Sequence, residues 1–360
     1  MTAFVDDPAE VTPAWLTEVL RAGGADVEVA RLRFEPIGTG QTGASYRFHL
    51  DVRPERGGAD ARVPRTVVLK MAAGPEKVRK RLAPGYRSEV GFYRTFASSA
   101  AIRVPRCWSA EMSPDARSFT LVLEDAHPAL PGRQTEGCTL AQATAAVRNL
   151  AGLHASFWND ERLDHGSSWL RSLDASGMAI MAKMLAKATA AFVDRYRAEL
   201  SPEDVDTLHR TAGAVADWGR HTFTRRTLIH GDYRLDNLMF GPEDDVLAVD
   251  WQTLEAGFPA RDLAYFLSTA LPPEIRRPHE EVLVGAYHER LVHHGVADYP
   301  AELCFDDYRR GMLQGPLITV IGCISASGPR TADSDRMFLS MAAHTCAAIR
   351  ELGTLDLLSA

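Results

Sequence analysis

The sequence has few of the features that mark secreted proteins, zinc-stabilised domains or membrane proteins. It has an odd number of widely spaced cysteines and no C-x-x-C pair, which argues against a disulfide frame or a zinc ribbon (Cys107, Cys138, Cys304, Cys323 and Cys346). The N-terminal stretch MTAFVDDPAEVTP is acidic where a signal peptide is basic and then apolar. The apolar run Pro316–Ala326 is too short to cross a bilayer. We therefore expect a cytoplasmic protein without a membrane partner.

An excess of positive charge is also missing. The chain has 40 lysines and arginines against 47 acidic residues, so its net charge is −7 and its isoelectric point is near 6.0. With no basic surface to contact phosphates, we expect no nucleic-acid partner. The 46% hydrophobic and 24% charged composition is that of an ordinary globular protein. The oligomeric state stays open between monomer and homodimer.

The first third of the chain has the pattern of a small sheet. Alternating or β-branched residues predict strands at Arg31–Ile37, Ser45–Val52, Arg65–Ala72 and Ser118–Ala126. Thr12 and Pro13 predict the start of a helix that runs through Leu20. A second helix is predicted at Arg87–Ala97.

Helical spacing dominates the rest of the chain. It predicts helices at Thr139–Trp158, Gly177–Leu200, Pro202–Arg220, Pro273–His294, Phe305–Ile324 and Ser334–Leu357. Residues 124–138 are rich in proline and glycine and separate the two patterns. We therefore predict an α+β protein with one domain at residues 1–126 and a second at residues 127–360.

One polar stretch interrupts the helical part. Ile229–Phe240 reads IHGDYRLDNLMF, and the strands predicted at Asn237–Phe240 and Val246–Val249 form a hairpin around a GPEDD turn. The hairpin places Asp232 and Asn237 at its entry and Asp250 at its exit. Such hard oxygen ligands suit Mg²⁺, which takes one or two protein carboxylates together with phosphate oxygens and water.

These residues resemble a known catalytic loop. HGDYRLDN is similar to the H-G-D-x-x-x-x-N loop of the aminoglycoside phosphotransferase and choline kinase superfamily, which is related to protein kinases. The VDWQ segment that follows resembles the ecdysteroid-kinase-like and choline-kinase-like branches in particular. The resemblance implies a bilobal protein-kinase-like fold, with a small N-terminal lobe built on an antiparallel sheet and a larger, mainly helical C-terminal lobe. It also implies that Asp232 is the catalytic aspartate and that Asn237 and Asp250 bind Mg²⁺.

The resemblance implies a nucleotide site in the N-terminal lobe. Lys70 closes a predicted strand and would hold ATP phosphates, while Glu89 in the next helix would hold Lys70. The glycine-rich turn would close over the phosphates with its backbone N–H groups (Gly38, Thr39, Gly40, Gln41, Thr42 and Gly43). The adenine would bind the backbone of a hinge formed by Glu124, Asp125 and Ala126.

The same glycines allow a rival interpretation as a dinucleotide-binding fingerprint. That fingerprint needs a glycine turn that opens a helix, so that the pyrophosphate meets the helix N-terminus. The residues after Gly43 read ASYRFHLDV and alternate like a strand. A glycine-rich hairpin therefore fits better than a hydride-transferring dehydrogenase.

Ten residues separate Asp250 from Arg261, and no A-P-E motif follows. This favours a small-molecule acceptor over a protein, and Asp306, Asp307 and Asp333 are candidate contacts for a cationic acceptor. We predict an ATP- and Mg²⁺-dependent phosphotransferase that acts on a hydroxyl of a small molecule. One alternative is an antibiotic-inactivating kinase of the aminoglycoside or macrolide type, although the C-terminus offers just Glu351 and Asp356 where aminoglycoside enzymes carry a carboxylate cluster. Another is a catalytically silent nucleotide-binding protein, which would show gaps in the catalytic set.

Overall fold

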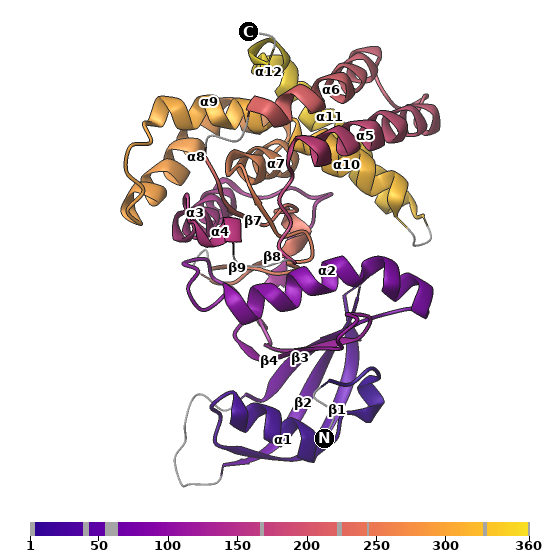
Figure 1. Cartoon of the computed structure of the whole chain (residues 1–360), viewed down its shortest axis with the longest axis vertical. Helices are drawn as coiled ribbons and strands as arrows, with labels where there is room; N and C mark the ends of the chain where they lie inside the picture. Colours follow the sequence, from indigo (N-terminus) through magenta and orange to yellow (C-terminus); the bar gives the residue numbers. More distant parts are fainter. Residues whose placement is uncertain are drawn as a thin grey trace. The chain divides into compact units, whose positions relative to one another are not determined.

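The computed structural model describes residues 4–38, 43–54, 64–165, 169–221, 225–242, 245–326 and 330–358. Its chain divides into two compact units (Figure 1). The first contains Met1–Ser98, Val104–Pro128 and Asp250–Thr253, and the second contains Ser99–Arg103, Ala129–Val249 and Leu254–Ala360. The sequence placed one boundary after residue 126. The observed units differ from this division at two short segments. Ser99–Arg103 belongs to the second unit, and Asp250–Thr253 belongs to the first.

The first unit contains an antiparallel sheet of five strands in the order β1-β2-β3-β5-β4 (Figure 1). The strands are β1 (Val27–Ile37), β2 (Ala44–Pro54), β3 (Thr66–Met71), β4 (Cys107–Met112) and β5 (Phe119–Glu124). The sequence had predicted four of them. It missed β4, in which only one residue, Trp108, is fully buried, so the strand carries no clear alternation of apolar and polar residues.

Helix α1 (Pro13–Ala22) begins as predicted, because the Thr12 side chain accepts a hydrogen bond from the Trp15 backbone nitrogen. One face of α1 buries Trp15, Leu16 and Leu20 against the sheet. Each fully buried aliphatic side chain of this kind contributes roughly 1.5–3 kcal/mol to folding. The sheet and α1 therefore share one core.

Helix α2 (Glu76–Thr95) starts earlier than predicted and continues through Pro84. An interior proline costs a helix about 3 kcal/mol. Tertiary packing outweighs this cost, because Tyr86, Val90 and Phe92 on α2 are all fully buried.

The second unit is mainly helical. Its helices are α3 (Leu140–Ser156), α4 (Arg162–His165), α5 (Ala175–Arg195), α6 (Pro202–His221), α7 (Ala260–Ala270), α8 (Pro273–His293), α9 (Ala301–Gly311), α10 (Gln314–Ser325), α11 (Ala332–Glu351) and α12 (Thr354–Leu357). Two predicted helices are each split in two. The chain turns at Met312 and Leu313 between α9 and α10, and at Leu352 and Gly353 between α11 and α12, where Gly353 has a φ of +61°. Apart from these two splits, the predicted α+β class is confirmed, with a five-stranded sheet in the first unit and mainly helices in the second.

Two small sheets complete the second unit. Strands β6 (Leu130–Pro131), β8 (Leu238–Phe240) and β9 (Val246–Ala248) form one, with β8 and β9 paired as the predicted hairpin. Strands β7 (Thr227–Ile229) and β10 (Glu255–Gly257) form the other. The polar stretch at residues 230–237 thus connects a strand of one sheet to a strand of the other, and both sheets fix its ends.

Helix α5 is long and apolar enough to cross a membrane by length and composition alone. Its Leu185 and Phe192 side chains are buried in a core that α5 shares with α6, α10 and α11. This places one side of α5 in the protein interior.

The segment Ser99–Arg103 is attached to α3. The Arg103 backbone nitrogen donates to Asn149 Oδ1 at 2.8 Å, and the Ala101 nitrogen donates to Ser156 Oγ at 2.8 Å. The close approach of this segment to α3 requires glycine at position 152, because a Cβ atom there would lie 2.4 Å from the Ala101 carbonyl oxygen. These contacts explain why the segment belongs to the second unit.

Candidate active site

The loop that follows β7 is shaped by its own glycine and by α7. Gly231 has a φ of +80°, a left-handed conformation that favours glycine. The carboxylate of Asp262, in the first turn of α7, accepts hydrogen bonds from the backbone nitrogens of His230 at 2.6 Å and Gly231 at 2.9 Å. Asp262 therefore anchors the loop to α7.

Asp262 is fully buried and remains a strong acceptor. Burial by itself would raise its pKa, but the hydrogen bonds from His154 and Gly231 hold the pKa below its ordinary value. On the other side of the loop, His230 Nε2 donates to the Val249 carbonyl oxygen at 3.0 Å, and the Asp232 nitrogen donates to His230 Nδ1 at 3.3 Å. His230 thereby ties the loop to the end of β9.

The carboxylate of Asp232 is held from two sides. The Tyr265 hydroxyl, also on α7, donates to Oδ1 at 3.0 Å. Asn237 Nδ2 donates to Oδ2 at 3.0 Å and to the Asp232 carbonyl oxygen at 2.8 Å. Arg234 Nε lies 3.4 Å from Oδ2. The Asp232 side chain keeps 24% of its surface exposed, so the carboxylate is both oriented and accessible to a second molecule.

Arg234 and Asp236 complete this loop. Arg234 also forms an ion pair with Asp236, whose Oδ1 accepts a hydrogen bond from the Gln134 nitrogen at 2.9 Å. Gln134 also accepts a hydrogen bond from the Leu235 nitrogen at 3.2 Å through its side-chain oxygen. Gln134 is therefore a loop-positioning residue, although the sequence around it gave no signal of this.

The predicted metal ligands have donor groups that fit Mg²⁺. Both hydrogen bonds of the Asn237 side chain are donated by its nitrogen, which leaves its amide oxygen for a ligand. Asp250 has a φ of +67°, a conformation that costs a non-glycine residue about 1–3 kcal/mol and that recurs at functional positions. Within the described residues no group of three or more His, Cys, Asp or Glu side chains forms a metal cage. Mg²⁺ binds through few protein ligands and takes the rest from phosphate and water, so it needs no such cage. Asn237 lies in the second unit and Asp250 in the first.

Lys70 and Glu89 come together in the first unit. Lys70 Nζ lies 2.7 Å from Glu89 Oε1 and 3.4 Å from Asp250 Oδ1. Burial lowers the pKa of Lys70, but the two carboxylates outweigh burial and raise it. Burial raises the pKa of Glu89 in spite of Lys70. The site therefore places the Lys70 ammonium group beside two carboxylates, where its positive charge is favoured.

Two residues that the sequence analysis did not assign to the site support this pair. Gln252 Nε2 donates to the second oxygen of Glu89, Oε2, at 3.2 Å. The Trp251 ring stacks on Phe92 of α2, with ring centroids 3.6 Å apart and planes 7° apart. The glutamine of the VDWQ segment thus holds Glu89, and its tryptophan packs the segment against α2.

The glycine-rich turn is described at its two ends. Gly38 has a φ of +71°, and a Cβ atom on Gly43 would lie 3.5 Å from Lys70 Cε. The turn thus ends beside the lysine. Four predicted residues, Thr39, Gly40, Gln41 and Thr42, lie outside the described part. The residues after Gly43 form strand β2, which contradicts the dinucleotide-binding interpretation because that needs a helix there.

The predicted hinge is partly occupied by the protein itself. The Glu124 nitrogen donates to the Arg106 carbonyl oxygen at 2.8 Å. The Asp125 side chain accepts hydrogen bonds from Arg47 Nε at 2.7 Å and from the His127 nitrogen at 3.1 Å. The Glu124 N–H group is therefore not free for adenine, whereas the Glu124 carbonyl oxygen and the backbones of Asp125 and Ala126 stay candidates.

The acidic residues proposed to contact a cationic acceptor are paired with arginines instead. Asp307 is buried and accepts hydrogen bonds from Arg225 at 2.6 and 2.7 Å. Asp306 pairs with Arg309, and Asp333 with Arg336. Asp307 is therefore compensated inside the fold and loses its basis as an acceptor contact, whereas the exposed Asp306 and Asp333 stay candidates.

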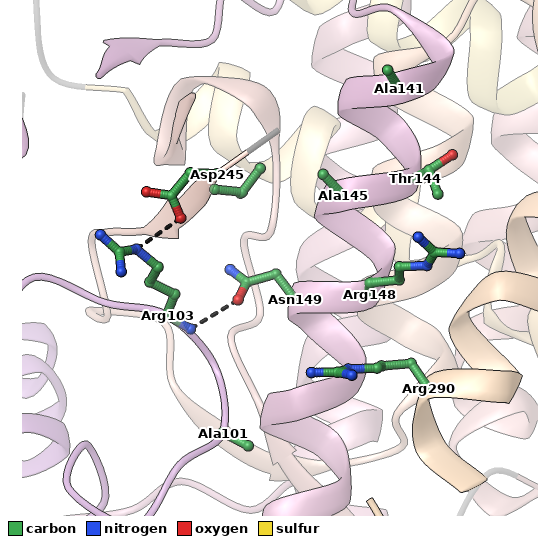
Figure 2. A pocket seen from close by; sticks show the side chains of 10 residues that line it. Ala101, Arg103, Ala141, Thr144, Ala145, Arg148, Asn149, Asp245 and Arg290 are labelled. Atoms are coloured by element: carbon green, nitrogen blue, oxygen red, sulfur yellow. Dashed lines mark hydrogen bonds and ion pairs between the residues drawn. The ribbon is translucent and has the colours of Figure 1, made fainter. Parts of the chain in front are cut away.

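The second unit contains a cavity of about 450 Å³ (Figure 2). Arg103, Arg148 and Arg290 line it, and Arg103 forms an ion pair with Asp245 at 2.8 Å (Figure 2). None of the predicted site residues lines this cavity.

Comparison with solved structures defines the class of fold. The chain is similar to an aminoglycoside-phosphotransferase-type protein from Ralstonia eutropha, with a TM-score of 0.52, 17% identity, and 94% of this chain and 97% of that chain covered. It is similar to choline kinase from Cryptosporidium parvum, with a TM-score of 0.57, 11% identity, and coverage of 91% and 92%. It is also similar to amicoumacin kinase hAmiN in complex with AMP-PNP and Ca²⁺, with a TM-score of 0.52, 12% identity, and coverage of 87% and 88%. The fold is that of the protein-kinase-like small-molecule kinases.

The family follows from the sequence. The model of the ecdysteroid kinase-like family matches residues 42–296, which is more than half of the chain. The protein belongs to the ecdysteroid kinase-like family.

Curated relatives share shorter segments. The chain is 51% identical over 55 residues to acyl-CoA dehydrogenase family member 10 of Mus musculus, and 30% identical over 124 residues to member 11 of Homo sapiens. The matches cover 13% and 34% of this chain, but only 5% and 14% of those proteins. The segment they share is therefore a small part of a longer polypeptide in both relatives.

Proposed function

We propose that the protein transfers the γ-phosphate of Mg·ATP to a hydroxyl group of a small molecule. The observation that carries this proposal is the Asp232 carboxylate, held by Tyr265 and Asn237 and still partly exposed. The charged Lys70 between Glu89 and Asp250 supports the nucleotide half of the proposal. Membership of a kinase-like family agrees with both.

Asp232, Lys70, Asn237 and Asp250 would each have a separate role in the reaction. Asp232 would accept the proton of the acceptor hydroxyl as its oxygen forms a bond to the γ-phosphorus and the bond from that phosphorus to ADP breaks. Lys70 would hold phosphate oxygens, while Asn237 and Asp250 would hold Mg²⁺. When bound, Mg²⁺ supplies neutralisation of the phosphate charge. Positioning and charge compensation would provide most of the rate.

The test is ADP release from Mg·ATP in the presence of a panel of acceptors. The panel contains aminoglycosides, macrolides, choline-like amino alcohols, sugars and sterols. Asp232→Ala is the blank, and we expect it to lower turnover by about 10²–10⁴-fold with nucleotide affinity retained. Full activity in Asp232→Ala would refute the mechanism. ATP binding without any acceptor-dependent ADP release would favour the catalytically silent alternative.

A second acceptor class is favoured by the curated relatives. Both are named as acyl-CoA dehydrogenases, and each contains a segment similar to this chain. Domains joined in one polypeptide often act on one metabolite, so a hydroxyl-bearing acyl thioester belongs in the panel beside the antibiotics. ADP release with a hydroxyacyl-CoA, and none with the matching acyl-CoA that lacks the hydroxyl, would assign this class. The opposite result, with an aminoglycoside or macrolide as the active acceptor, would assign the antibiotic-inactivating alternative.

A further inference from the structure

Three consecutive residues of the catalytic loop are each hydrogen-bonded to α7. Asp262 accepts from the nitrogens of His230 and Gly231, and one helical turn later the Tyr265 hydroxyl donates to Asp232 Oδ1. Residues three apart in a helix lie on the same face. One face of α7 therefore fixes both the backbone of the loop and the carboxylate at its centre.

The contact from Tyr265 determines which way that carboxylate faces. Tyr265 is fully buried, so its ring has a single well-packed position. Burial and the charge of Asp232 raise the pKa of Tyr265 well above its ordinary value, so the hydroxyl keeps its proton and acts as a donor. With Oδ1 bonded to Tyr265 and Oδ2 to Asn237, the carboxylate cannot rotate without losing one of the two bonds.

We propose that Tyr265 is a positioning residue for phosphoryl transfer, which acts by holding the Asp232 carboxylate in the orientation that meets the acceptor hydroxyl. This inference rests on the proposed function. Orientation of a reacting group contributes to the rate and not to the binding of the ground state. Loss of the hydroxyl should therefore lower kcat and leave the binding of both substrates nearly unchanged.

The test compares Tyr265→Phe with Tyr308→Phe. The two are well matched, because Tyr308 is also fully buried and its hydroxyl donates to a carboxylate, that of Glu280, at 3.1 Å. We expect Tyr265→Phe to lower kcat about tenfold or more, the scale of one lost hydrogen bond to a charged group. The KM for the acceptor and the Kd for Mg·ATP should stay within about twofold. Tyr308→Phe should keep the wild-type kcat.

The Asp232→Asn background shows whether Tyr265 acts through Asp232. Adding Tyr265→Phe to Asp232→Asn should produce little further loss of kcat, because residues that act as a unit are not additive. Equal losses of kcat in both backgrounds, or an unchanged kcat in Tyr265→Phe at wild-type melting temperature, would refute the inference and leave the proposed function intact. If the melting temperature of Tyr265→Phe falls further than that of Tyr308→Phe, kcat is compared at a temperature where both variants are fully folded. If the wild type releases no ADP that depends on Asp232 with any acceptor, the proposed function fails and the inference fails with it.

Discussion

The side-chain amide of Gln252 donates a hydrogen bond to Glu89 Oε2 at 3.2 Å, while Lys70 binds the other oxygen of the same carboxylate at 2.7 Å. Glu89 is fully buried, so both of its oxygens need partners inside the protein. Gln252 lies two residues after Asp250, which itself approaches Lys70. Residues 250–252 therefore contribute twice. Asp250 supplies a second carboxylate for Lys70, and Gln252 supplies the hydrogen-bond donor for the second oxygen of Glu89.

Replacing Gln252 tests this relationship. Gln252→Met keeps the length of the side chain and removes the donor, which leaves a buried carboxylate oxygen without a partner. We expect the free energy of unfolding to fall by about 1–3 kcal/mol. Gln252→Glu should lose more at neutral pH, because it adds a like charge beside Glu89. Urea denaturation measures both variants, and equal stability of the wild type and Gln252→Met would contradict the prediction.

The Lys70–Glu89 pair should affect stability and nucleotide binding differently. Lys70→Met leaves Glu89 as an uncompensated buried charge, and we expect a loss of about 3–5 kcal/mol of stability together with weak Mg·ATP binding. The double variant Lys70→Met/Glu89→Met replaces the whole pair with apolar groups of similar length. It should regain most of the stability while still failing to bind the nucleotide, since the ammonium group is gone.

Calorimetry with Mg·ATP and urea denaturation, carried out on the same preparations, separate the two effects. Recovery of nucleotide affinity in the double variant would show that Lys70 serves only the fold. Failure to regain stability would show that the pair contributes more than charge compensation, for example through the hydrogen bond from Gln252.

The catalytic loop and its hairpin could be predicted from the sequence because their signals are local. The motif from His230 to Asn237 is contiguous, and strands β8 and β9 fall within a residue of the predicted ranges. The predicted contact between Lys70 and Glu89 is also present in the structure, although it came from a family resemblance and not from a pattern.

The supporting residues could not be predicted, because their partners lie far away in the sequence. Gln252 is 163 positions from Glu89, and Tyr265 is 33 positions from Asp232. Every residue of helix α7 is buried, so burial does not set Tyr265 apart from its neighbours. Propensity and periodicity describe one element at a time, whereas these contacts depend on how elements pack.

The carboxylate of Asp307 should serve stability and not acceptor binding. It is buried and bonded to Arg225 and to the Tyr299 hydroxyl, so Asp307→Asn weakens an internal ion pair. We expect the free energy of unfolding to fall by about 1–3 kcal/mol. Asp333→Asn, at a side chain that is 76% exposed, should change stability by less than about 0.5 kcal/mol. If Asp307→Asn raised the KM for a cationic acceptor such as choline without any loss of stability, Asp307 would be a substrate contact after all.

The anchoring of the loop by Asp262 should depend on pH in a defined direction. Burial alone would raise the pKa of Asp262, but the hydrogen bonds from His154 and Gly231 outweigh burial, so the folded-state pKa lies below the unfolded value. A depressed pKa of this kind contributes stability at all pH values above the unfolded pKa, and the contribution is lost as the pH falls through the folded pKa. We therefore expect Asp262→Asn to be less stable than the wild type by a constant amount between about pH 5 and pH 7, with the difference shrinking below about pH 4. Urea denaturation of both proteins at pH 7, 5, 4 and 3 measures the difference directly. A difference that grows as the pH falls would mean that the Asp262 carboxylate is not the stabilising species, and that the hydrogen bonds to His230 and Gly231 do not depend on its charge.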